Sequence, residues 1–288
     1  MTSANAGSLT DSALAADLAL RALGATGLAE ESPLARLLAS VQATTLVERG
    51  DLTGANRALV KAGLTDDLPA GTASAFARYA RGQLALAQRR HAEAVREFTE
   101  CGRWLRTRRV RNPAVLPWRS HCAYALAALG TRNRALALAD DDLRLARCRQ
   151  QPLPLGRALR AKGVLLGDQD GEQLISASNQ ILRPTDLRIE QARSLAELGK
   201  RALRTNRKVR ARELLLRAHR IASECGAKLL DAELRAELRS AGSRSMHSTL
   251  CGTDALTARE RRVTELAGDG WSNDAIAKHL YLARWKLI

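Results

Sequence analysis

The side chains best able to bind a metal or transfer a proton are scattered along this chain. Asp140, Asp141 and Asp142 form a run that resembles a metal-binding segment, but it follows an apolar helix face and is interpreted as a solvated helix segment. No nucleophile lies beside a base at a spacing that predicts catalysis. The histidines show neither HExxH nor paired metal spacing, and we expect surface residues rather than metal ligands or bases. They are His91, His121, His219, His247 and His279.

Nucleotide and redox chemistry are not indicated either. The P-loop pattern G-x-x-x-x-G-K-[ST] does not occur, because Gly199-Lys200 is followed by Arg201 and no glycine stands five residues earlier. The five cysteines are odd in number and lack CxxC spacing, which is typical of a reducing cytosol. The first cation is Arg21, so the apolar N-terminal stretch does not resemble a signal peptide. We expect a cytoplasmic protein that is not an enzyme and has no cofactor, metal or membrane span.

Positive charge is the strongest bias in the composition. The chain has 46 Lys and Arg residues against 30 Asp and Glu residues, a net charge of +16. One interpretation is a track for nucleic-acid phosphates. The other is the arginine-rich codon usage of a GC-rich genome, placed on solvated helix faces. The last 33 residues carry only +2 of the net charge, so both interpretations concern the upstream region.

The C-terminal residues 256–288 carry the signals of two short helices joined by a tight turn. Thr257-Ala-Arg-Glu260 is a capping box, and Gly268-Asp269-Gly270 ends the first helix. Ser272 is a favourable N-cap for the second helix, and a third helix begins near Ala283. These elements are the ingredients of a helix-turn-helix DNA-binding module.

The stretch LTARERRVTELAGDGWSNDAIAKHLYL resembles the start of a LuxR-type helix-turn-helix domain. The family pattern is roughly LTxRExxVxxLxxxGxSNxxIAxxLxxSxxTVxxH. It is matched in register at Leu256, Thr257, Arg259, Glu260, Val263, Leu266, Gly270, Ser272, Asn273, Ile276, Ala277 and Leu280. The resemblance implies the C-terminal portion of a large ATP-binding LuxR-type transcriptional regulator of actinobacteria, in which helical repeats precede this module.

The sequence departs from that family pattern toward its end. Ala275 stands where the family usually carries Glu, and the segment from Ala283 to Leu287 replaces S-x-x-T-V. The sequence stops at Ile288, within the expected recognition helix, as a frameshift would produce. A six-residue helix is marginal alone, so we expect a truncated module that binds DNA weakly. The candidate DNA-contacting residues are Ser272, Asn273, Lys278, Arg284, Trp285 and Lys286.

Five upstream stretches share a repeated pattern of paired helices. Equivalent positions recur at Ala55, Ala94, Ala135, Gln173 and Ala211, with small residues twelve positions earlier at Ala43, Gly82, Ala123, Ala161 and Gly199. Four positions later stand Leu59, Phe98, Ala139, Ala177 and Leu215. Small residues let paired helices approach, and the larger residue fills the gap between them. The pattern resembles tetratricopeptide-like repeats; the alternative is an Ala- and Leu-rich antiparallel bundle.

These observations predict an all-α chain with four parts. Residues 1–30 form an N-terminal helix or partly disordered lead, and residues 31–240 a tetratricopeptide-like helical-hairpin solenoid. Residues 241–255, rich in Ser, Gly and Thr, form a linker before the truncated LuxR-type module of residues 256–288. The predicted function is DNA-binding transcriptional regulation, with a protein or peptide partner on the repeats. The alternative is an interaction scaffold whose DNA-binding tail is vestigial.

Overall fold

The computed structural model describes residues 18, 32–65, 68, 71–240 and 266. Within these ranges the regular elements are α-helices, as the sequence predicts. The chain divides into two compact units, Met1–Glu237 and Leu238–Ile288. In the second unit, Leu266 is helical and buried. No helix among the described residues has the length and apolar character needed to cross a membrane.

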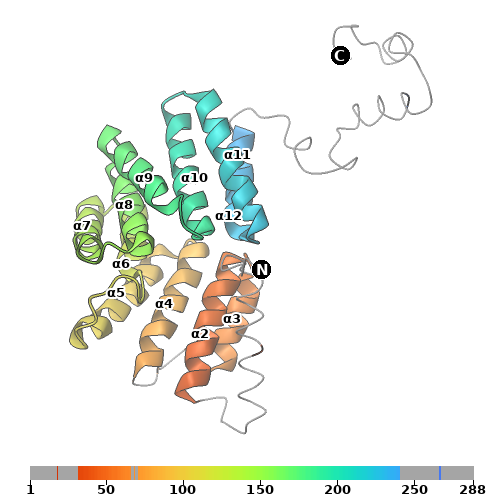
Figure 1. Cartoon of the computed structure of the whole chain (residues 1–288). Coiled ribbons are helices and arrows are strands. Elements are labelled where there is room, and N and C mark those ends of the chain that lie inside the picture. Colours follow the sequence, from red (N-terminus) through yellow and green to blue (C-terminus); the bar gives the residue numbers. More distant parts are fainter. Residues whose placement is uncertain (1–17, 19–31, 66–67, 69–70, 241–265, 267–288) are drawn as a thin grey trace. The chain divides into compact units, whose positions relative to one another are not determined.

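The first unit is an array of antiparallel helical hairpins (Figure 1). The prediction of a helical-hairpin solenoid is confirmed. The hairpins are α2 (Pro33–Glu48) with α3 (Leu52–Lys61), α4 (Thr72–Ala87) with α5 (His91–Thr107), α6 (Trp118–Ala128) with α7 (Arg132–Arg149), α8 (Pro152–Leu166) with α9 (Gln169–Leu182), and α10 (Arg188–Arg204) with α11 (Lys208–Glu224). Helix α12 (Lys228–Ser240) follows.

Small residues allow the two helices of each hairpin to approach closely. A Cβ atom added to Gly82 would lie 2.6 Å from Cε1 of Phe98, and one added to Gly199 would lie 2.7 Å from Cγ of Leu215. Phe98 and Leu215 are fully buried. The large side chain therefore occupies the space that the glycine leaves, as the repeat pattern predicts.

The fourth hairpin departs from the predicted register. Gln173 is exposed and Ala177 is only partly buried, whereas Gly171 and Ile175 are buried. The turn of this hairpin consists of Gly167 and Asp168 alone, with Gly167 at φ +67°, and it is one residue shorter than the turns of the other hairpins. Because the turn is shorter, the close contact between α9 and α8 lies nearer the start of α9. Gly171, rather than residue 173, lies against α8.

Successive hairpins pack through neighbouring helices. The sequence predicts that the Pro-containing segments 110–119 and 150–156 lie between hairpins; this holds for most of the first, whereas most of the second lies within the first turns of α8. Residues 108–117 connect α5 to α6, and Pro152 begins α8. Pro is favourable at this first helical position because its missing N–H would have no helical partner there. At the other end of the unit, Leu229 of α12 packs against the core formed by α2, α3 and α4. Helices far apart in sequence therefore enclose a common inner surface.

Candidate functional site

A groove runs along the inner surface of the helical array. It contains a cavity of about 280 Å³ whose lining comes from α2, α4, α6, α8, α10 and α12. Each hairpin thus contributes its first helix, and none of the second helices lines this cavity. A neighbouring cavity of about 240 Å³ continues toward residues 114–117. The two cavities share Glu48, Gln83, His121, Arg157, Glu190 and Arg193.

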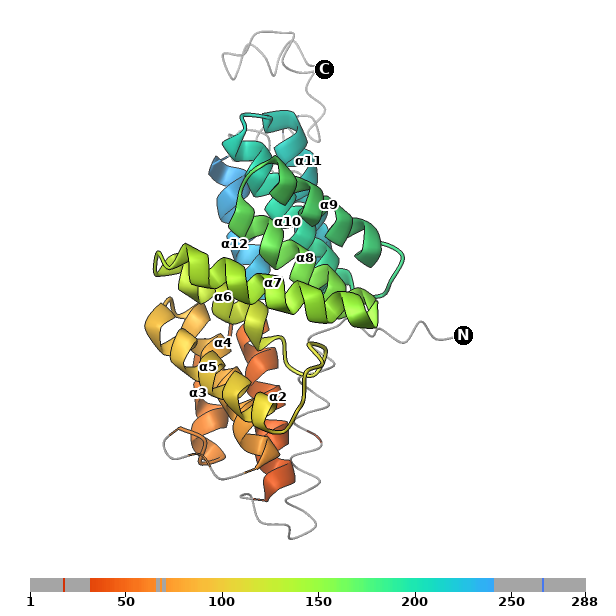
Figure 2. The same cartoon turned by 90° about the vertical axis from the view of Figure 1, so that its left-hand side faces the viewer.

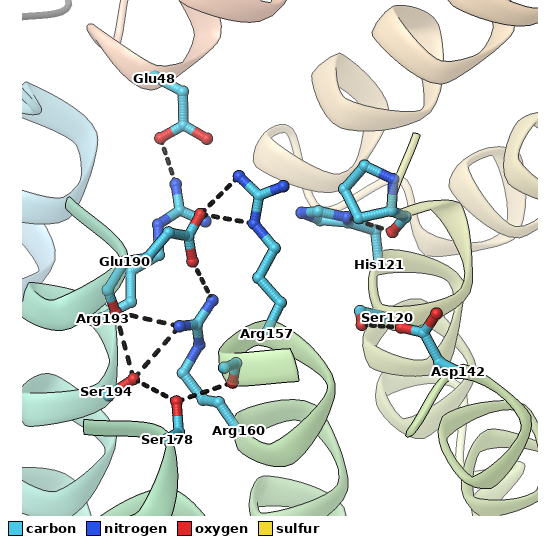
Figure 3. Close-up of polar contacts among 12 residues, drawn as sticks. Glu48, Ser120, His121, Asp142, Arg157, Arg160, Ser178, Glu190, Arg193 and Ser194 are labelled. Carbon is cyan, nitrogen blue, oxygen red and sulfur yellow. Dashed lines mark hydrogen bonds and ion pairs between the residues drawn. The ribbon is translucent and has the colours of Figure 1, made fainter. Parts of the chain in front are cut away.

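Glu190 is the centre of the polar network in this groove (Figure 3). Arg157 Nε donates to its Oε1 at 2.8 Å, and Arg160 Nη2 to its Oε2 at 2.5 Å. Arg160 Nη1 also donates to the Glu190 carbonyl oxygen at 3.0 Å. The hydroxyl groups of Ser178 and Ser194 extend this network and lie 2.8 Å apart. The network joins α8, α9 and α10 through buried side chains.

Charge balance explains why Glu190 remains ionised in this buried place. Burial by itself would raise the pKa of its carboxyl group, but Arg157, Arg160 and Arg193 hold that pKa well below its usual value. Burial likewise opposes the charge of Arg157, and the facing Glu190 carboxylate outweighs it and raises the arginine pKa. The groove therefore keeps fixed, opposite charges over the physiological pH range.

Arg193 connects α10 to α2. Its Nη2 forms an ion pair with Glu48 of α2, although 145 positions separate the two residues. Their side chains are 24% and 22% exposed, so the pair borders the groove. The Arg193 Nε atom is buried and has no hydrogen-bond partner among the described residues. A buried, unsatisfied donor costs free energy, and an acceptor on a bound molecule would satisfy it.

His121 is neutral and held in one tautomer. Its Nδ1 lies 2.8 Å from the Pro117 carbonyl oxygen, which only accepts hydrogen bonds, so Nδ1 carries the proton. Nε2 then accepts from Gln83 Nε2 at 3.3 Å. Burial lowers the His121 pKa to about 4; the Pro117 hydrogen bond opposes this shift, and Arg193 and Arg157 add to it. His121 thus presents no positive charge to the groove at neutral pH.

The cavity has an apolar side as well as a polar one. Val47, Leu86 and Val164 line it together with Leu229 and Leu230 of α12. Burial of an apolar side chain of a ligand against them is favourable by roughly 25 cal/mol per Å² of area removed from water. The groove can therefore hold a chain segment that carries both apolar and hydrogen-bonding groups.

Three sequence expectations about ionisable side chains are wrong. Asp142 is buried and accepts a hydrogen bond from Ser120, because the α7 face that carries it packs against α6. Burial raises its pKa. His219 is also buried, with Nδ1 2.6 Å from Oδ1 of Asp231 on α12. His121 is not a surface residue but part of the groove wall.

The sequence-predicted DNA contacts lie outside the described residues. This applies to Ser272, Asn273, Lys278, Arg284, Trp285 and Lys286, so the structure does not show whether they come together. In the part of the chain that the structure describes, no group of three or more His, Cys, Asp and Glu residues is arranged to hold a metal ion.

Comparison with solved structures finds chains of similar fold, and RapI is one of them. No protein-family model matches the sequence, and no curated protein does. The apo form of RapI, known from a crystal structure, aligns over 94% of this chain and 84% of RapI. The two have 11% identical residues and a TM-score of 0.46. No ligand or partner of this chain follows from that likeness.

Proposed function

We propose that the helical array binds a peptide, or an extended segment of a partner protein, in its inner groove. The observation that carries this proposal is the convergence of the five first helices and α12 on one groove. Helical-repeat arrays provide extended concave surfaces of this kind. Binding pockets typically combine an apolar lining with a few fixed polar groups, which is the composition found here.

The positions of the polar groups indicate what such a segment carries. Arg157 and Arg193 are both 24% exposed, whereas Arg160 is 7% exposed and enclosed by Glu190. We infer that the first two arginines donate to carbonyl or carboxylate oxygens of the bound segment. An apolar side chain of the segment would occupy the side of the cavity formed by Leu86, Val164 and Leu229.

Selection from a random dodecapeptide library on the full chain tests this proposal. Enriched peptides would be synthesised and titrated calorimetrically against the wild type and two tryptophan variants. Ala87→Trp places an indole in the groove, and Val209→Trp places the same group on α11, where Val209 is 88% exposed. The expected result is at least tenfold weaker binding to Ala87→Trp alone. Equal affinity for both variants, or no enriched peptide, would contradict the proposal.

A second proposed function is DNA binding by residues 256–288, as in a LuxR-type transcriptional regulator. The observation that favours it is the match of twelve positions to the LuxR-type pattern. In this proposal Ser272 and Asn273 meet a phosphate at a helix N-terminus, and Trp285 lies beside the cations of the third helix. Partner binding in the groove would then regulate a DNA-bound protein.

Fluorescence anisotropy with a labelled duplex across a salt series tests the second function. The wild type would be compared with Lys278→Gln/Arg284→Gln/Lys286→Gln and with a chain ending at Ala255. Removal of each phosphate-binding cation should reduce the salt slope by about 0.9. If neither change alters affinity or slope, residues 256–288 do not touch DNA, and the chain is better described as an interaction scaffold.

A further inference from the structure

Exposed arginines gather where the second helices of three consecutive hairpins end. Four stand at or after the end of α5, two in the last turn of α7, and one directly after α9. They are Arg106, Arg108, Arg109, Arg111, Arg147, Arg149 and Arg183, and we call this set the arginine edge. Because each group ends a second helix, the repeat places all three groups on the same edge of the array, on the right in Figure 2.

The arginines of the arginine edge have no carboxylate partners in the part of the chain that the structure describes. None of its seven members forms an ion pair with a carboxylate of the described residues. Some cations in other places do so, such as Arg207 with Glu172, whereas single exposed arginines such as Arg89 do not. The positive charge of this edge is therefore available to a partner, and what sets the edge apart is that seven such arginines gather at the ends of three second helices.

The helix dipole accounts for only part of this pattern. A cation in the last turn of a helix is favourable, and Arg106, Arg147 and Arg149 occupy such positions. Arg109 and Arg111 lie beyond the end of α5, where the effect of the dipole has fallen off. Arg109 also adopts φ +56°, a left-handed conformation in which Gly or Asn is preferred.

Two tryptophans hold the first part of the arginine edge in place. The Arg106 guanidinium lies 5.5 Å from the centre of the Trp118 ring, and that of Arg108 lies 5.0 Å from the Trp104 ring. A guanidinium stacked on an indole keeps its N–H groups at its rim, where they can donate to phosphate oxygens. The stacking orders these side chains without neutralising their charge.

The spacing of the three groups suits a long polyanion. Helices α5 and α7 both pack on α6, and α7 and α9 are linked in the same way through α8. Packed helices lie about 8–10 Å apart, so successive arginine groups are within about 20 Å of each other. DNA carries one negative charge per about 1.7 Å of its axis and can meet all three groups at once.

We propose that the arginine edge binds the phosphate backbone of duplex DNA without reading its sequence. The choice of DNA among polyanions rests on the proposed DNA-binding function of residues 256–288. In a chain that contacts DNA through both regions, the arginine edge supplies affinity and residues 256–288 supply base contacts.

Two charge-matched variants of the full chain test this proposal. The edge variant replaces Arg109, Arg111, Arg147 and Arg149 with Gln. The control variant makes the same change at Arg89, Arg134, Arg204 and Arg212, which are exposed, have no carboxylate partner among the described residues and lie at or near turns within hairpins. Each variant lowers the net charge by four. Anisotropy with a 30-base-pair duplex would be measured over a salt series, and circular dichroism would confirm the fold of both.

The edge variant should lose at least two units of salt slope and bind at least tenfold more weakly at about 0.1 M salt, whereas the control should lose less than one unit. Equal losses would assign the effect to net charge and overturn the proposal. So would binding of poly-glutamate but not DNA by the wild type, which indicates an acidic protein partner. Unchanged binding by Lys278→Gln/Arg284→Gln/Lys286→Gln would reject the function of residues 256–288 while leaving the edge result intact.

Discussion

Acidification should destabilise this protein through His121, and His121→Asn should remove that part of the effect. The His121 pKa is about 4 in the folded chain, because burial lowers it and Arg193 and Arg157 repel the charged form. In the unfolded chain it is about 6.5. Between these values the unfolded state binds a proton that the folded state does not, so the free energy of unfolding falls as the pH falls.

The magnitude follows from these two pKa values. The shift from 6.5 to about 4 corresponds to about 3 kcal/mol over the whole window. Between about pH 7 and pH 4.5, linkage gives a loss of about 2 kcal/mol from this group. Asn is a suitable replacement because its side-chain amide can still donate to the Pro117 carbonyl oxygen, as Nδ1 of His121 does.

Urea denaturation followed by fluorescence of the four tryptophans measures this effect. Wild type and His121→Asn would be compared at pH 7.0, 5.5 and 4.5. The difference in unfolding free energy between the two proteins should shift by about 2 kcal/mol in favour of the variant as the pH falls. Parallel pH dependences would show that His121 accepts its proton as readily in the folded chain, and the account of the groove wall would be refuted.

Three further predictions concern stability and are checked by urea denaturation at pH 7. Glu190→Gln should cost about 3–5 kcal/mol because Arg160 is left buried without its partner, and the cost should be at most half as large in Arg160→Met/Glu190→Met. An equal loss in both variants would contradict this. Gly82→Ala should cost about 1–3 kcal/mol through overlap with Phe98, and the additional change Phe98→Leu should recover part of it. Arg109→Gly should stabilise by about 0.5–1 kcal/mol, since φ is +56° there; a loss of stability would show that its side chain matters more than its backbone.

The hairpin array could be predicted because its packing rule is local in sequence. Gly82 and Phe98 are sixteen positions apart, and the same offset separates Gly199 from Leu215. One repeat thus predicts the next. The predicted register is wrong at Gln173 because the turn between α8 and α9 is one residue shorter than the other turns, which changes how α9 faces α8. Sequence spacing alone does not reveal the length of a turn.

The candidate site could not be predicted in the same way. Arg157 and Arg160 share one helix face, as do Glu190 and Arg193, and each pair is visible in the sequence. Their convergence depends on the angle at which α8 meets α10, and the contact of Arg193 with Glu48 depends on the curvature of the entire unit. Neither quantity is encoded in a short motif. A single histidine likewise carries no signal of burial, so the sequence does not reveal that His121 lies in the groove wall.

Hydrogen exchange of the full chain, with and without a peptide selected on it, tests the central claim most directly. If the peptide occupies the inner groove, amides of α4, α6, α8 and α10 should gain protection, because these helices line it. Protection in α5, α7 and α9 should remain unchanged. Protection confined to those second helices would place the binding surface on the other side of the array and contradict the account.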